Sequence, residues 1–88
     1  MKIKIEKLPN EKMTELGIKS WPIWTCEVSE FDWEYTEQES CLLLKGDVEV
    51  ISNTETVKFK AGDFVVFPKG LQCKWKVYQP VEKHYLFG

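Results

Sequence analysis

Short apolar stretches interrupted by turn-forming residues dominate the chain from Trp24 onward. Cys73, Trp75 and Val77 alternate with polar residues, the period-two pattern of a half-buried strand. Similar runs are separated by turn signals at Lys45-Gly46-Asp47, Asn53-Thr54 and Ala61-Gly62-Asp63. Many short strands with glycine and proline turns at close spacing predict an all-β fold, either a sandwich or a barrel.

Other runs extend this prediction. The apolar run over residues 41–44 predicts a strand that is covered on both sides, and a further buried strand over residues 64–67 is stopped by Pro68. Trp24 and Cys26 occupy even-numbered positions, whereas the next apolar residues, Phe31, Trp33 and Tyr35, occupy odd-numbered positions. This change predicts a bulge near residues 29–30.

The N-terminal part contains the only helix that the sequence predicts. The alternation of Met1, Ile3 and Ile5 with charged residues favours a half-buried strand at the start of the chain. A short helix follows, which Asn10 is expected to cap and Gly17 to end.

Size and composition indicate one small domain over residues 1–88, with 43% hydrophobic and 14% aromatic residues. A fold of this length buries only about 60% of the surface that its unfolded chain exposes, so its core is marginal. A second protomer would add buried surface, and we therefore expect a homodimer. The aromatic content, which includes 4 Trp, is high enough to supply a core, a ligand pocket or an interface.

Charge and cysteine usage exclude several classes of function. The net charge is -2, and no basic stripe is present, so nucleic acid is not an expected partner. No apolar run reaches the roughly 20 residues that span a bilayer, and the N-terminus lacks the apolar stretch of a signal peptide. The 3 cysteines contain no CxxC pair, which favours reduced thiols and a cytoplasmic location.

Two segments have a spacing that is known from one fold family. They read Trp33-x-Tyr35-x3-Glu39-x6-Gly46 and Gly62-x5-Pro68-x-Gly70-x2-Cys73. This pattern resembles the two motifs of cupins, which are jelly-roll barrels also called double-stranded β-helices. The chain looks like the small single-domain cupins of bacteria and plants, most of which have no assigned function. They are related to the cupin domains of ureidoglycine aminohydrolases and ethanolamine-utilisation proteins.

The resemblance implies an all-β cupin barrel with one short N-terminal helix, and it departs from metal cupins at the ligand positions. In metal cupins three histidines and a glutamate hold Mn, Fe, Ni or Zn. Here the histidine positions hold Trp33, Tyr35 (or Glu34, if the spacer before the glutamate has four residues) and Cys73, and only Glu39 is retained. Stable metal sites usually need three or four protein ligands, so we expect no standard metal centre and no other cofactor. A non-standard divalent metal site remains an alternative, built from Glu39, Cys41, Cys73 and His84.

The same register places an aromatic pocket around the retained carboxylate. Trp33, Tyr35 and Trp75 are expected to face the barrel mouth with Glu39, where they would bind a small polar metabolite together with Cys73. In the other interpretation the aromatic residues simply fill the barrel, and Cys73 is a small buried apolar residue. The alternative function is an enzyme that uses Glu39 as a catalytic general acid or base.

The remaining expectations concern burial. Trp21 and Trp24 are expected in the core or at a dimer contact, and His84 at a structural or surface position. A buried charge costs stability, so Glu39→Gln is expected to keep or raise the melting temperature. The barrel interior is predicted to contain Tyr35, Glu39, Cys41, Leu43, Phe67, Cys73 and Trp75.

Overall fold

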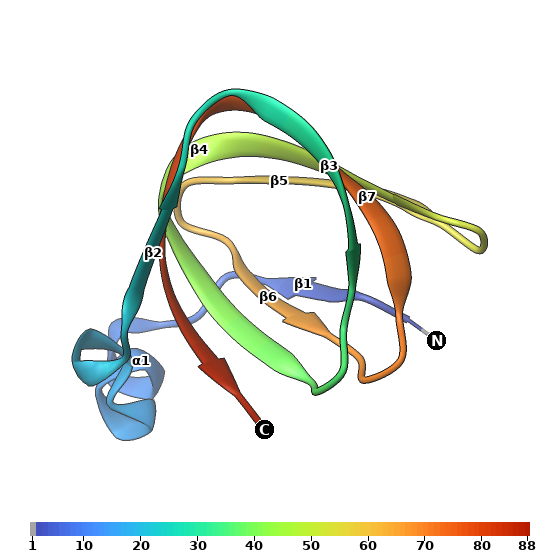
Figure 1. Cartoon of the computed structure of the whole chain (residues 1–88). Helices are drawn as coiled ribbons and strands as arrows, with labels where there is room; N and C mark the ends of the chain where they lie inside the picture. Colours follow the sequence, from blue (N-terminus) through green and yellow to red (C-terminus); the bar gives the residue numbers. More distant parts are fainter. Residues whose placement is uncertain (1) are drawn as a thin grey trace.

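The computed structural model describes residues 2–88 and consists mainly of antiparallel strands (Figure 1). One helix, α1, and one 3-10 turn, η1, precede most of the strands. The elements are β1 (Lys4–Glu6), α1 (Asn10–Leu16), η1 (Ile18–Ser20), β2 (Ile23–Cys26), β3 (Ser29–Glu34), β4 (Glu39–Ser52), β5 (Thr56–Lys60), β6 (Phe64–Phe67) and β7 (Gln72–Phe87).

Two long strands, β4 and β7, pair with each other along most of their length (Figure 1). They run through both parts of the sheet, which we call its two walls. Where residues 39–43 pair with residues 83–87, the strand order is β1-β6-β4-β7-β2. Where residues 47–52 pair with residues 73–79, β5 and β3 flank the same two strands. This arrangement confirms the predicted all-β cupin fold.

One predicted turn is wrong, because β4 continues through Gly46. Gly46 has a φ of 125°, and a Cβ atom placed there would lie 2.9 Å from Cγ2 of Val81. The β4–β7 register also shifts on both sides of this glycine. Gly46 therefore bends a continuous strand between the two walls, where its missing side chain lets β7 approach.

The predicted bulge lies close to its expected position but on the partner strand. Cys26 pairs with Val81 and Ser29 pairs with Val77, so residues 27–28 lie opposite residues 78–80. The additional residue belongs to β7, which contains Pro80 here. Because of this offset, Trp24 and Phe31 line the same pocket although their positions differ in parity.

The N-terminal strand and helix are present, with two differences from expectation. Ile3 is buried and Ile5 is exposed, whereas Met1 lies outside the described residues. The helix is preceded by Pro9, whose carbonyl accepts hydrogen bonds from Lys12 and Met13, so Asn10 is not the cap. Proline fixes φ at a helix-compatible value, which explains this start. Gly17 ends the helix in the left-handed conformation, as predicted.

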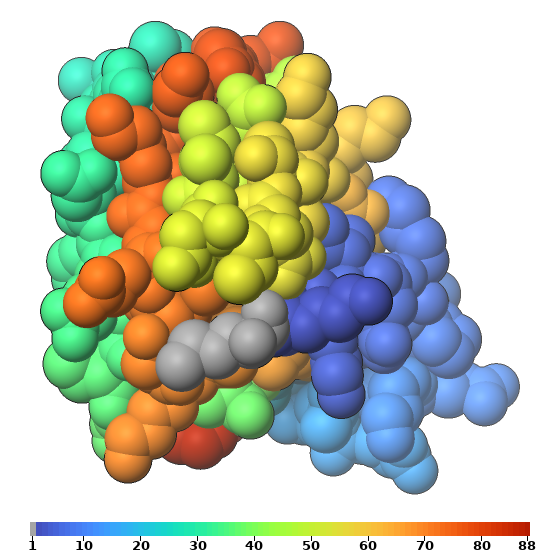
Figure 2. Space-filling view, turned by 90° about the vertical axis from the view of Figure 1, so that its right-hand side faces the viewer, coloured from blue at the N-terminus to red at the C-terminus, as the bar shows by residue number. Residues whose placement is uncertain are grey.

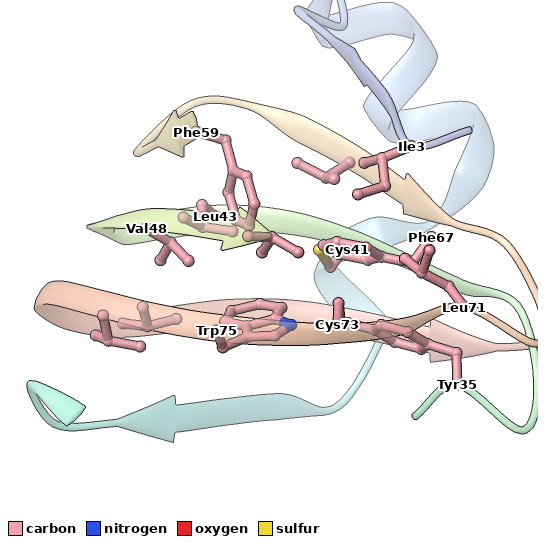
Figure 3. Packing of buried hydrophobic residues seen from close by; sticks show 14 residues of the cluster. Ile3, Tyr35, Cys41, Leu43, Val48, Phe59, Phe67, Leu71, Cys73 and Trp75 are labelled. Carbon is pink, nitrogen blue, oxygen red and sulfur yellow. The ribbon is translucent and has the colours of Figure 1, made fainter. Parts of the chain in front are cut away.

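The core lies between the two walls, as the close view in Figure 3 shows. All seven residues predicted for the barrel interior are buried. A second, smaller cluster lies where Ile18 packs on Leu42 and Phe64 of the outer sheet face. The N-terminal segment also contacts the β4–β5 hairpin through a hydrogen bond from the Ile3 amide to Glu55, on the side shown in Figure 2. Within residues 2–88, neither helical segment could span a membrane.

Candidate functional site

A pocket of about 180 Å³ opens between the two walls on the side of β2 and β3. The end of β3, the start of β4 and both halves of β7 contribute to it, which places residues from the two cupin-like segments side by side. Its lining is mostly aromatic and contains one acidic and one basic side chain. The lining residues are Trp24, Phe31, Trp33, Tyr35, Glu39, Trp75, Lys83, Tyr85 and Phe87.

The charged residues of the pocket form a buried ion pair. The ammonium of Lys83 lies 2.7 Å from Oε2 of Glu39, and it donates a hydrogen bond to that oxygen. The Lys83 and Glu39 side chains are only 6% and 3% exposed. Removing two charges from water is costly, so the pair persists because each charge neutralises the other.

Aromatic rings enclose the ammonium of Lys83. Its Nζ lies 4.7 Å from the ring centroid of Trp24 and 4.6 Å from that of Trp75. A cation over an indole face is attracted by the negative potential of the ring, and this attraction increases when water is excluded. Trp24 therefore lines the pocket besides packing on the core, which the sequence did not indicate.

Tyr35 is a buried lining residue of the pocket and is held by the second cupin-like segment. Its amide donates to the carbonyl of Leu71 at 2.8 Å, and its carbonyl accepts from Gly70 at 2.6 Å. Its ring stacks on Phe67 with centroids 4.8 Å apart. Burial, and then the negative charge of Glu39, raise the pKa of Tyr35 far above its ordinary value. The phenol is therefore protonated at neutral pH.

Trp75 connects the pocket to the core. Its ring stacks on Phe31 and meets Trp24 and Phe59 edge to face, with centroids 5.6–6.0 Å apart. In Figure 3 its indole nitrogen points toward the end of the core that contains Cys73 and Tyr35. This buried N–H has no hydrogen-bond partner among the described residues. It is a donor that the folded chain leaves unpaired.

The other candidate residues lie outside the pocket lining. Cys41 is fully buried in the core, and burial raises its pKa to about 12. Cys73 is also buried, which raises its pKa to about 11, and it borders a shallow depression between β3 and the end of β4. His84 points to the opposite face of β7 from Lys83, where its Nδ1 lies 2.9 Å from the carbonyl oxygen of Trp21. This contact assigns His84 a structural position.

These residues do not fit a divalent metal ion. Among residues 2–88, no three His, Cys, Asp or Glu side chains gather closely enough to hold one. His84 points away from Glu39, and the ammonium of Lys83 already neutralises the carboxylate. A cation added beside Glu39 would meet the positive charge of Lys83 and a protonated phenol.

Sequence reasoning missed Lys83, Phe31, Tyr85 and Phe87 as pocket residues. The odd positions of β7 face inward at Cys73, Trp75 and Val77, and the same parity applies again at Val81 and Lys83. Following this alternation beyond Pro80 would have indicated an inward lysine. Trp33 lines the mouth of the pocket, which is the position that the sequence predicted, and it is 48% exposed there.

Fold and pocket together define a small cupin. Residues 13–85 match the EutQ-like cupin domain family. A DUF861 family protein from Thermotoga maritima is 50% identical, with a TM-score of 0.97, and the alignment covers 99% of this chain and 100% of that chain. The protein therefore belongs to the EutQ-like cupin family.

More distant structures share the fold. The EutQ protein of Clostridium difficile is 17% identical with a TM-score of 0.69, over 97% of this chain and 66% of that chain. A DUF861 family protein of unknown function from Pseudomonas syringae is 24% identical with a TM-score of 0.68, over 75% of this chain and 29% of that chain. A comparison with curated proteins gave no match.

Proposed function

We propose that this cupin binds a small metabolite in the pocket between its two walls. The observation that carries the proposal is the Glu39–Lys83 ion pair, which is buried at the bottom of an aromatic-lined pocket. Pockets that bind small molecules typically combine apolar walls with a few fixed polar groups. Here Trp33, Tyr35 and Trp75 supply the walls, and the ion pair supplies the polar groups.

The size of the pocket limits the ligand. Pockets for drug-sized molecules usually have volumes of at least about 300 Å³. The volume of about 180 Å³ in this protein therefore suits a molecule with a single ring or a short chain. Trp33 lies half-exposed at the mouth, where it can contact the part of the ligand that faces water.

A metabolite screen tests this proposal directly. Indole fluorescence and melting temperature are recorded for the purified protein with a panel of one-ring and short-chain metabolites. We expect some compounds to raise the melting temperature and quench the fluorescence of the wild-type protein. The double variant Glu39→Gln/Lys83→Met should lose both responses, because the polar groups of the pocket are replaced.

The matched control is Lys74→Met, which removes a lysine from the same strand. Lys74 is half-exposed and forms a surface ion pair with Glu30, outside the pocket. This variant should respond to the same compounds as the wild-type protein. If the Glu39→Gln/Lys83→Met variant binds as tightly as Lys74→Met, the ion pair is not part of a binding site and the proposal is wrong.

Acid–base catalysis is a second candidate function of the same pocket. Glu39 supplies a carboxylate that can accept a proton, and Tyr35 lines the same pocket, where its hydroxyl can orient a ligand beside that carboxylate. Each compound that binds is therefore incubated with the protein and followed by NMR. Conversion that Tyr35→Phe abolishes without weakening binding would support catalysis, and stable ligand would contradict it.

We further propose a cytoplasmic homodimer. The three cysteines are free thiols, which suits a reducing compartment. Ile23 on the edge strand β2 and Leu86 and Phe87 at the end of β7 are apolar side chains between 42% and 53% exposed. Burying such surface contributes about 25 cal/mol per Å², which matters for a small domain. Light scattering that reports a monomer at micromolar concentration would contradict the dimer.

A further inference from the structure

The buried indole N–H of Trp75 is an unpaired donor on a residue that lines the pocket, and it points toward the end of the core that contains Tyr35, another lining residue (Figure 3). Trp75 is 2% exposed, lines the pocket and has no acceptor for Nε1 among residues 2–88. An indole nitrogen can only donate, so the missing partner must be an acceptor atom. Leaving such a buried donor without a partner destabilises the fold, and a suitable ligand atom would recover that loss.

Lys83 adds a second donor close to the first. An ammonium has three N–H donors, and Glu39 accepts from it at 2.7 Å. The rest of the ammonium faces the rings of Trp24 and Trp75, which are weak acceptors. Because Nζ lies 4.6 Å above the Trp75 ring, a ligand oxygen near the indole N–H is also near this positive charge.

The charge of Glu39 decides between a neutral and an anionic acceptor. Glu39 already neutralises Lys83, so the polar end of the pocket carries no net charge. A ligand carboxylate placed there would meet the carboxylate of Glu39 in a region with little water, where repulsion between like charges is strong. A carbonyl oxygen of a neutral molecule meets no such repulsion.

We infer that the pocket selects neutral, planar, one-ring molecules that carry a carbonyl oxygen, such as aromatic amides and lactams, and that this oxygen accepts a hydrogen bond from Trp75. This inference rests on the proposed binding function and specifies its ligand class. The flat ring packs against the aromatic side chains of Phe31 and Trp33, and its carbonyl points inward to the two donors.

Three probes of similar shape test the inference: benzamide, benzoate and toluene. Binding is followed by NMR on protein labelled with ¹⁵N, in which each tryptophan gives one indole N–H signal. The signals are assigned from through-bond spectra of the wild-type protein, so no variant has to fold. Trp21 is the internal control, because it packs on Phe64 in the second cluster, away from the pocket.

We expect benzamide to bind about 3- to 10-fold more tightly than toluene, which corresponds to one net hydrogen bond. Benzoate should bind at least about 10-fold more weakly than benzamide. The indole proton of Trp75 should move downfield with benzamide and much less with toluene, and the Trp21 signal should stay in place.

Each contrary result has a distinct meaning. Equal binding of toluene and benzamide with a stationary Trp75 signal would overturn the acceptor position, while the pocket would still bind apolar ligands. Benzoate binding as tightly as benzamide would overturn the selection of neutral ligands. If none of the probes binds, the inference is wrong, and the metabolite screen then shows whether the binding function fails with it or another ligand class fits.

Discussion

Lys83 contacts Glu39 although the two residues are not opposite each other in the β4–β7 ladder. Glu39 pairs with Phe87, and Lys83 pairs with Leu43. The lysine side chain therefore extends along the inner face of β7 to place its Nζ 2.7 Å from the carboxylate. This diagonal contact joins β4 to β7 beneath the pocket, so the charged residues of the pocket also hold the two long strands of the fold together.

The first prediction concerns this ion pair. Glu39→Gln or Lys83→Met leaves the other charge buried without a partner, so each should lower the free energy of unfolding by about 3–5 kcal/mol. The double variant removes both charges and should recover most of that loss. Urea denaturation of the four proteins measures the coupling. The exposed Glu30–Lys74 pair is the matched control, and its coupling should stay below about 1 kcal/mol.

The second prediction concerns alkaline pH. Burial raises the pKa of Cys41 to about 12 and that of Cys73 to about 11, from 9.0, and it raises the pKa of Tyr35 as well. Between pH 9 and 12 the folded protein therefore keeps protons that the unfolded chain releases. The stability that these groups contribute is fully present below pH 9 and is lost as the pH rises.

We expect the free energy of unfolding to fall above pH 9 by up to about 1.4 kcal/mol per pH unit for each such proton. Denaturation at a series of pH values measures this slope. It should be smaller in Cys41→Ala and unchanged in Cys26→Ala, which keeps both buried thiols. A slope that is the same in all three proteins would assign the alkaline loss to other groups.

The third prediction concerns thiol reactivity. Cys26 is partly exposed, whereas Cys41 and Cys73 are buried. With an aromatic disulfide reagent at pH 8, we expect one thiol per chain to react quickly and the other two only after unfolding. Mass spectrometry of the labelled peptides identifies the fast site. Rapid labelling of Cys73 in the folded protein would mean that the depression beside it opens more widely than the structure shows.

The fourth prediction concerns Gly46. Gly46→Ala introduces a Cβ at 2.9 Å from Cγ2 and 3.1 Å from Cα of Val81, at a φ of 125°. Backbone strain and this overlap together should lower the free energy of unfolding by about 2 kcal/mol or more. Gly62→Ala is the control, because its φ is also positive while its nearest neighbour is Lys7 Nζ at 3.5 Å. Equal losses would show that the contact with Val81 is not important.

The sequence predicted those parts of the fold that depend on local patterns. Alternation at Cys73 and Trp75, the stop at Pro68 and the glycine at the end of the helix all reappear in the structure. Gly46 was misassigned because a glycine with positive φ occurs both in a turn and in a bend within a strand. Only the pairing of β4 with β7, which joins distant segments, distinguishes the two.

The same limit applies to the pocket. Trp33, Tyr35, Glu39 and Trp75 were predicted from motif spacing, and all four line it. Lys83 was missed because the inward alternation at Cys73 and Trp75 was not followed past the exposed residues 78–80, where the same parity resumes and reaches the lysine. Its presence also changes the expected effect of Glu39→Gln, from neutral or stabilising for an isolated buried carboxylate to destabilising for one half of an ion pair.

The sharing of β4 and β7 between both walls has a consequence for folding kinetics. Ser52 pairs with Cys73 at one end of the β4–β7 ladder, next to the segment that contains β5 and β6. Glu39 pairs with Phe87 at the other, outer end, which contains the C-terminal end of the chain. Each wall contains a different part of the same ladder. Chains rich in such non-local pairings fold in milliseconds to seconds. The Glu39–Lys83 ion pair lies at the outer end of that ladder, so we expect the pocket to be among the last parts of the molecule to assemble.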